Sequence, residues 1–179
     1  MFATAISQSI GGAVAPLPYC GSYVMAPIAI QIGASKSQKE NIFNEMSSSN
    51  IKFGIAFSEY FGSRDSSSIN FSNEKINGKT IFAIDCDYAT DILVSDASGK
   101  IGIVSIEDKN IEIVDLITVD KTRTYKEIKF SNANVEILEN TKKNTDAIEK
   151  ALDAGRIITA ADTLGASQAM LCLLYTSDA

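Results

Sequence analysis

The side chains available for chemistry are restricted, because the 179-residue sequence contains no histidine. That absence excludes Ser-His-Asp and Cys-His catalysis and every metal site that needs an imidazole ligand. Catalysis would have to rest on a carboxylate, a lysine, a tyrosine, a cysteine or a bound cofactor. The three cysteines, Cys20, Cys86 and Cys172, are too widely spaced for a CxxC site and odd in number, so we expect neither a metal centre nor a disulfide framework. Asp85 and Asp87 flank Cys86, which we interpret as a solvated turn beside a buried, unreactive thiol.

A second candidate is the end of the segment 55–63, where an apolar run breaks into Gly62 and Ser63. A strand end of this kind offers free backbone amides to an anion, and glycine lets the backbone approach closely. Taken alone, an ordinary strand-turn is the better interpretation, because Gly and Ser are common turn residues.

Asp153 and Arg156 form the third candidate, one helical turn apart. The aspartate can accept a hydrogen bond from an amide, and the arginine can position an anionic or carbonyl group. The same two side chains can also form an intrahelical ion pair that contributes only a few tenths of a kcal/mol. Both interpretations stay open.

Composition narrows the class of partner. Sixteen basic against 22 acidic residues give a net charge of −6, without a basic run, so we expect no binding to nucleic acid or to an anionic membrane surface. A hydrophobic content of 45% with 21% charged residues indicates a folded globular protein. The N-terminal residues match neither a secretory signal nor a membrane span, and we expect a cytoplasmic location.

The elements that must position these residues begin with helices. A helix is predicted from about Ser22 to Ile32, ending at Gly33, which suits the position after a helix C-terminus. The next helix is predicted to start at Ser35, three residues before Gln38, which is a capping-box spacing.

From Ile51 the apolar period changes to two, which predicts a half-buried strand over 51–57. Further short runs follow at 69–75, 80–84, 91–95, 101–106, 110–117 and 125–130. Between two of them, Asn77-Gly78 is a type I′ hairpin signal. About seven short strands with regular turns predict a small antiparallel barrel or sandwich.

A last helix is predicted from Asn144 or Thr145, either of which can cap it. Residues 151–170 are small or apolar on most faces, which predicts a helix buried on all sides. Nothing else in this chain could surround it, so we expect missing helices or a partner subunit. Residues 172–179 break the pattern and look like the conceptual translation of a sequencing adapter, so natural sequence is expected to end near Met170 or Leu171. An ordinary native C-terminus is the alternative.

Five stretches, in this order and spacing, resemble the acyl-CoA dehydrogenase family over nearly everything from about Ser9 to Leu171. They are AVAPLPYCGS at 13–22, GASKSQK at 33–39, IAFSEYFGS at 55–63, DKTR and then IKF within 120–130, and LDAGR through LGASQAM within 152–170. The resemblance implies an α+β fragment with a helical N-terminal segment, an antiparallel β-barrel or sandwich and the start of an α-helical bundle. The expected boundaries are 1–50 for the end of the helical domain, 51–143 for the β domain, 144–171 for the first bundle helix and 172–179 for the tail.

The resemblance also implies that FAD lies between the β domain and the bundle, without a GxGxxG motif. The positions expected to meet it are Ile55, Phe57, Ser58, Gly62, Ser63, Ile81, Phe82 and Ala83. Those expected to meet an acyl-CoA substrate are Ser63, Asp153 and Arg156. No catalytic residue is expected, because Gly155 stands where some members carry their base and the usual alternative, a bundle glutamate, lies beyond the break.

The implied activity is α,β-dehydrogenation of an acyl-CoA thioester by a homo- or hetero-oligomer that passes electrons to electron-transfer flavoprotein or a similar acceptor. The fragment itself is expected to be inactive. Two alternatives remain. One is a non-catalytic partner subunit, favoured by Gly155, by Ile81 at an aromatic position and by Ala83 at a hydroxyl position. The other is a free-standing β module that binds a different ligand.

Overall fold

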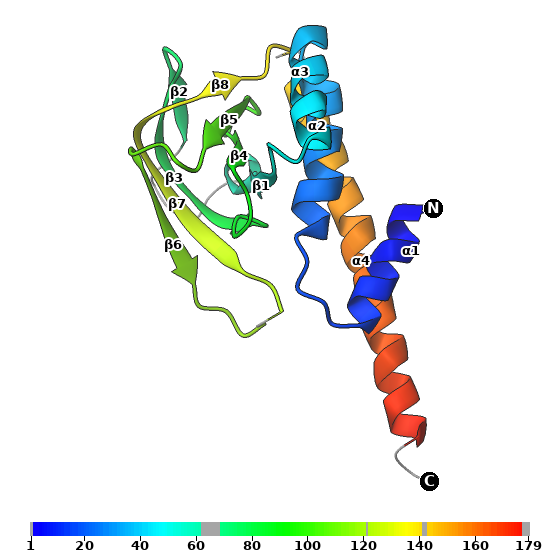
Figure 1. The fold of residues 1–179 in the computed structure, drawn as a ribbon. Coiled ribbons are helices and arrows are strands. Elements are labelled where there is room, and N and C mark those ends of the chain that lie inside the picture. Colours follow the sequence, from blue (N-terminus) through cyan, green and yellow to red (C-terminus); the bar gives the residue numbers. More distant parts are fainter. Residues whose placement is uncertain (1, 62–68, 121, 141–142, 177–179) are drawn as a thin grey trace.

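The computed structural model describes residues 2–61, 69–120, 122–140 and 143–176. A curled sheet lies on one side and the helices pack together on the other (Figure 1). The helical elements are α1 (Phe2–Gly12), the π-helix η1 (Tyr19–Met25), α2 (Ala26–Gly33), α3 (Lys36–Ser47), the 3-10 turn η2 (Ser58–Phe61) and α4 (Asn144–Thr176). The strands are β1 (Phe53–Ala56), β2 (Asn70–Ser72), β3 (Lys75–Ile84), β4 (Asp91–Ser95), β5 (Ile101–Ser105), β6 (Ile111–Leu116), β7 (Tyr125–Asn134) and β8 (Glu136–Ile137). The α+β class expected from the sequence is confirmed.

The eight strands form one mixed sheet in the order β6-β7-β3-β1-β4-β5-β8, with β2 paired to β3. Every pair is antiparallel except β1 and β4, which run parallel with Ile55 opposite Leu93. The prediction of a half-buried β1 is wrong, because all four of its residues are buried. Phe53 and Ile55 face the helices, while Ala56 belongs to a second core inside the curl of the sheet. The period of two was correct, but both faces of the strand are covered.

The hairpin between β2 and β3 turns at Asn73 and Glu74, both with positive φ, and not at Asn77-Gly78. The prediction from Asn77-Gly78 is therefore wrong, since both residues lie inside β3. There they sit at a register shift against β7, where the Asn77 side chain accepts a hydrogen bond from the backbone N–H of Asn132 at 2.7 Å. A positive φ of 119° at Gly78 explains why glycine is needed at this irregularity.

The capping box at the start of α3 is confirmed, with Ser35 and Gln38 each accepting from the other's backbone N–H. The preceding helix differs from the expectation, because a π-helix starts at Tyr19 and runs into α2. Gly33 is the last residue of α2. A Cβ atom at Gly33 would lie 2.9 Å from Oδ1 of Asn144, so this glycine allows the start of α4 to approach.

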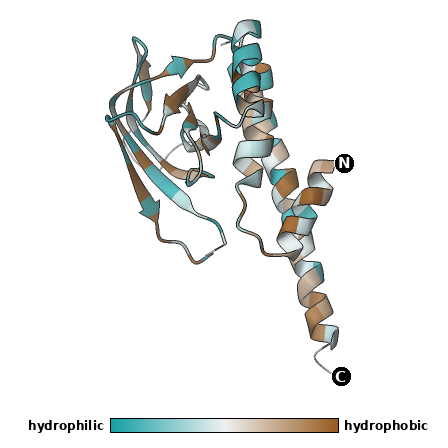
Figure 2. Cartoon of the chain, in the orientation of Figure 1, coloured by the Kyte–Doolittle hydropathy of each residue, from teal (hydrophilic) through white to brown (hydrophobic). Residues whose placement is uncertain are grey.

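Helix α4 is the axis of the helical layer, with α2 and η1 along its first half and α1 across its middle (Figure 1). Its inner face is buried at Ala147, Ile148, Ala151 and Ile158. Its second half is not covered, and the apolar residues Leu164, Met170, Leu171, Leu173, Leu174 and Tyr175 are exposed there, as expected for a helix that this chain alone cannot surround. Figure 2 shows this apolar stretch continuing along the projecting end.

By length and composition α4 could also cross a membrane, although the buried helix of a soluble bundle meets the same criterion.

Candidate functional site

A cleft of about 720 Å³ lies between the end of the sheet and the helices, where β3, β7, η1 and α4 converge. Its walls are formed by Cys20, Met25, Ile84, Asp85, Arg123, Thr124, Tyr125, Leu152, Gly155, Arg156, Thr159, Ala160 and Thr163. A concave, largely apolar site with a few converging polar groups is the usual form of a small-molecule site, and this volume is in the usual range.

Close packing of η1 on α4 closes one side of the cleft at Gly155. A Cβ atom at this position would lie 2.8 Å from Sδ of Met25, and the Cys20 thiol lies 3.8 Å from the Gly155 carbonyl oxygen. No larger side chain fits there without moving Met25.

Asp85 reaches from the end of β3 into the first turn of η1. Its Oδ2 accepts hydrogen bonds from the backbone N–H groups of Gly21 at 2.5 Å and Ser22 at 3.3 Å. These amides have no helical partner of their own, as is normal at a helix start. Burial raises the pKa of the Asp85 carboxyl, although the two amides oppose that shift. The interpretation of Asp85 as part of a solvated turn is therefore wrong.

The two residues after Asp85 agree with the sequence-based interpretation of a buried thiol at Cys86 and a solvated carboxylate at Asp87. Burial raises the pKa of the Cys86 thiol to about 12, so it is unreactive at neutral pH. Asp87 is exposed and pairs with Lys126 and the hydroxyl of Thr124. Among the residues that the structure describes, no group of three metal-ligating side chains could hold a metal ion.

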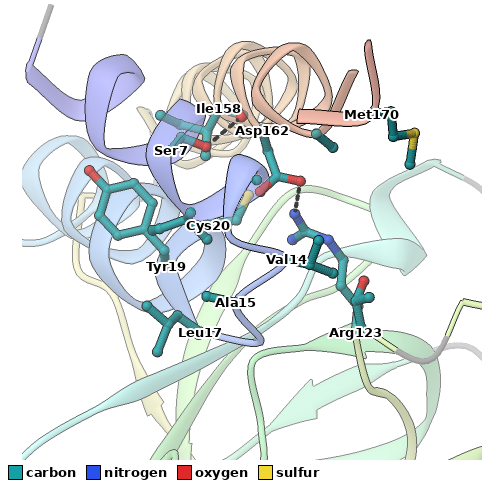
Figure 3. Close-up of a pocket in the computed structure, with 14 residues that line it drawn as sticks. Ser7, Val14, Ala15, Leu17, Tyr19, Cys20, Arg123, Ile158, Asp162 and Met170 are labelled. Carbon is teal, nitrogen blue, oxygen red and sulfur yellow. Dashed lines mark hydrogen bonds and ion pairs between the residues drawn. The ribbon is translucent and has the colours of Figure 1, made fainter. Parts of the chain in front are cut away.

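Arg123 and Asp162 form an ion pair of 2.9 Å that joins the segment before β7 to α4. Figure 3 shows the pair at the rim of a second cavity, of about 230 Å³, below α1. Arg123 lines both this cavity and the larger cleft. On the far side of the second cavity, the Ser7 hydroxyl donates to the Ile158 carbonyl oxygen at 2.8 Å.

The strand expected to meet a flavin carries a bulge. The register of β3 against β7 shifts between Thr80 and Ala83, so Ile81 and Phe82 together oppose one residue. Phe82 has a positive φ of 57° and is 57% exposed, while Ala83 is fully buried. Bulges often redirect a side chain next to an active site, and a positive φ at a bulky residue is a strained conformation.

Phe82 lies edge-on to Tyr125 with ring centroids 6.3 Å apart, and Tyr125 lines the cleft.

None of the described positions expected to meet a flavin, including Ile81, Phe82 and Ala83, is in the walls of the cleft. The side chains of Ile55 and Phe57 are buried in the core between sheet and helices. The Ser58 hydroxyl is hydrogen-bonded to that of Thr80 at 2.8 Å, next to the bulge. Gly62 and Ser63 fall outside the described residues.

Of the two expected substrate positions on α4, only Arg156 lines the cleft. Its guanidinium pairs with Asp153 at 2.6 Å, and both side chains are mostly exposed. The intrahelical ion pair therefore exists, and Arg156 contributes to the cleft as well.

The cleft residues that sequence reasoning missed are Arg123, Asp162 behind it, and Tyr125. Arg123 was noticed only inside the DKTR stretch, and Asp162 is 39 residues away, so no spacing rule could pair them. Their contact exists only because β7 starts where α4 passes the sheet.

Comparisons were made with known proteins. No protein-family model and no curated protein matches the sequence. Among solved structures, an acyl-CoA dehydrogenase from Geobacillus kaustophilus has a TM-score of 0.80 at 16% identity, covering 98% of this chain and 52% of its own. Glutaryl-coenzyme A dehydrogenase in its glutaryl-CoA complex gives 0.75 at 16% identity, covering 97% and 48%. Butyryl-CoA dehydrogenase from Megasphaera elsdenii gives 0.72 at 18% identity, covering 95% and 49%.

This chain has the fold of the acyl-CoA dehydrogenases. The fold expected from the sequence resemblance is confirmed. The chain spans about half the length of the acyl-CoA dehydrogenases it matches.

Proposed function

We propose that this chain is part of an FAD-dependent acyl-CoA dehydrogenase, which removes the α and β hydrogens of an acyl-CoA thioester. The observation that carries the proposal is the 720 Å³ cleft between the sheet end and α4, in a chain with the acyl-CoA dehydrogenase fold. The proposal includes a cytoplasmic location, assembly into an oligomer and an electron-transfer flavoprotein or similar acceptor.

The residues around the bulge of β3 suit a flavin. Phe82 and Tyr125 offer an exposed aromatic edge, onto which a flat ring system can pack. The Ser58 hydroxyl lies next to the same bulge, hydrogen-bonded to the buried hydroxyl of Thr80, and can interact with a ring oxygen or nitrogen atom. Bound FAD would supply the acceptor for the β-hydrogen, which leaves as a hydride.

The chain's own residues bind and orient the thioester. Met25, Ile84 and Leu152 form apolar walls that keep water from an acyl chain. Arg156 stands at the cleft with a guanidinium that can hold a carbonyl or an anionic group. A base for the α-proton is not assigned to any of these residues, and we expect the chain alone to be inactive.

A second candidate is a non-catalytic subunit of a heteromeric acyl-CoA dehydrogenase. Gly155 favours it, because glycine supplies no base at this position, and a larger side chain would have to displace the end of the Met25 side chain. A free-standing β module is disfavoured by the exposed apolar half of α4, which a self-sufficient domain would cover.

The test is a pair of titrations of the purified chain, with FAD followed by flavin fluorescence and with hexanoyl-CoA followed by calorimetry. Saturable binding of both ligands is expected, without turnover. Binding of the thioester alone would favour the non-catalytic subunit. If neither ligand binds, the proposal fails.

A further inference from the structure

The charged residues that line the cleft differ in whether they form salt bridges. Two arginines line it, and each is paired with its own aspartate, Arg123 with Asp162 at 2.9 Å and Arg156 with Asp153 at 2.6 Å. Asp85 also lines the cleft, but no arginine or lysine lies within salt-bridge distance of it in the described part of the chain. Asp85 is therefore the charged residue of the cleft that has no salt bridge to a described residue, although Arg123 is near enough to favour its ionised form.

The two oxygens of Asp85 have different surroundings. Oδ2 accepts from the amides of Gly21 and Ser22, whereas Oδ1 makes no hydrogen bond to any described residue. The two amides hold the carboxyl in place and favour its ionised form. A fixed, partly buried carboxylate with one unused oxygen strongly favours a ligand that donates hydrogen bonds and carries positive charge.

An aromatic residue lines the same cleft as this carboxylate. Ile84, the residue before Asp85, pairs across the sheet with Tyr125, and all three line the cleft. A cation is attracted to the face of an aromatic ring as well as to a carboxylate. The cleft thus holds two groups that attract a cation, a carboxylate at the end of β3 and an aromatic ring at the start of β7.

We propose that this cleft selects a substrate whose acyl tail ends in a protonated amine, recognised by Asp85 and Tyr125. The proposal deepens the proposed function and rests on it for the thioester part of the ligand. Recognition of the amine depends only on the cleft. A plain alkyl tail would leave the Asp85 charge desolvated and unpaired, which is costly.

Several ionisable groups influence the Asp85 carboxyl. Arg123 faces it from the segment before β7, the Cys20 thiol from η1, and Asp87 from its own turn. Arg123 favours the ionised form and Asp87 opposes it. Binding of the amine should weaken as pH falls through the raised pKa of Asp85, because the protonated carboxyl is neutral.

The experiment compares three thioesters of equal chain length by calorimetry with the purified chain, namely hexanoyl-CoA, 6-aminohexanoyl-CoA and adipoyl-CoA. We expect the amino compound to bind about tenfold or more tightly than the other two, as for a charge-assisted contact in a partly buried site. In Asp85→Asn, whose amide oxygen can still accept from Gly21 and Ser22, this preference should disappear. Asp87→Asn is the matched control, because Asp87 pairs with Lys126 outside the cleft, and it should retain the preference.

A variant that fails to fold would be recognised by circular dichroism, and the comparison of the three thioesters on the wild-type chain would still decide. Equal affinities for hexanoyl-CoA and 6-aminohexanoyl-CoA would overturn the proposal while leaving the proposed function intact. So would tighter binding of adipoyl-CoA, which would make Arg123 or Arg156 the selecting group. If no thioester binds, hexylammonium is the remaining probe. If hexylammonium binds to the wild-type chain but not to Asp85→Asn, the amine site is supported and the acyl-CoA function is refuted. If hexylammonium does not bind either, both proposals are refuted.

Discussion

Gly165 of α4 packs so closely on Gln8 of α1 that a Cβ atom at position 165 would lie 1.8 Å from the Gln8 carbonyl oxygen. On the other helix, a Cβ atom at Gly11 would lie 1.9 Å from the Asp162 carbonyl oxygen. Two glycines thus let the two backbones cross at contact distance. Residues of both helices at this crossing, together with Asp162 and its partner Arg123, line the smaller cavity.

The first prediction concerns this crossing. Gly165→Ala should lower the free energy of unfolding by about 1–3 kcal/mol, because the added methyl group must push the two helix backbones apart. Gly12→Ala is the control, since a Cβ atom there meets only the Gly165 carbonyl oxygen at an ordinary 3.5 Å. Urea denaturation followed by circular dichroism measures both. Equal stability of the two variants would contradict the close crossing.

The second prediction concerns the pair of Arg123 and Asp162, whose side chains are 31% and 23% exposed. Asp162→Asn should cost about 1–2 kcal/mol of stability, less than a fully buried pair because solvent screens part of the charge. Asp153→Asn breaks the exposed pair with Arg156 and should cost no more than about 0.5 kcal/mol. Chemical denaturation at low and high salt compares them. An equally small loss in Asp162→Asn would show that the partly buried pair contributes little to stability.

The third prediction is a pH dependence. Burial raises the pKa of Asp85 in the folded chain above its unfolded value. Its favourable contribution to stability is therefore complete below the unfolded pKa, near 3.8, and is lost as pH rises through the folded pKa. Asp85→Asn resembles the protonated form at every pH, so its stability relative to wild type should increase between pH 4 and neutrality. Denaturation curves across that range measure the difference, and a difference that stays flat or falls with pH would refute the raised pKa.

The fourth prediction separates folding from cofactor binding at the bulge. In Phe82→Gly, relief of the positive φ gains about 1 kcal/mol, and loss of the edge contact with Tyr125 costs about as much. Stability should therefore change little, while FAD affinity measured by fluorescence falls about tenfold through loss of a stacking surface. Asn132→Gly relieves a similar positive φ of 65° on β7 and should leave FAD binding unchanged. If Phe82→Gly binds FAD as tightly as the wild-type chain, Phe82 does not contact the flavin.

The fifth prediction concerns the exposed end of α4. Leu164, Met170 and Leu171 are each more than half exposed, and an apolar stripe of this kind promotes association. The chain should form concentration-dependent oligomers in analytical ultracentrifugation. The triple substitution of these residues by glutamine should shift the chain towards the monomer. A strictly monomeric wild-type chain would show that the stripe has no partner in the isolated chain.

Local signals predicted the elements that depend on neighbours in the sequence. The capping box of Ser35 and Gln38 formed as expected, and the strand at 91–95 begins and ends where the apolar run does. The Asn77-Gly78 turn failed because β3 continues through it to pair with β7 over its whole length, and long-range pairing outweighed the local preference. The start of η1 was mislocated because its first amides bond to Asp85, a residue more than sixty positions away.

For the candidate site too, local sequence patterns indicated some residues, and only long-range contacts brought in the others. Arg156 was found because the stretch that carries it resembles a substrate-contacting turn of the acyl-CoA dehydrogenase family. Asp85, Arg123 and Tyr125 were missed as cleft residues, since only the approach of β3 and β7 to α4 brings them together.

The sequence by itself determined what chemistry this chain can perform, because the absence of histidine and the small residue at position 155 do not depend on folding. It also determined the class of fold, through the change of apolar period near residue 50 and the apolar last helix. Only the tertiary structure decided which carboxylate of the cleft has no salt bridge to a described residue, because charge compensation depends on distances between residues far apart in the chain. Whether Asp85 is solvated or buried is likewise set by η1 and α4 packing over the end of the sheet, and no local pattern encodes that contact.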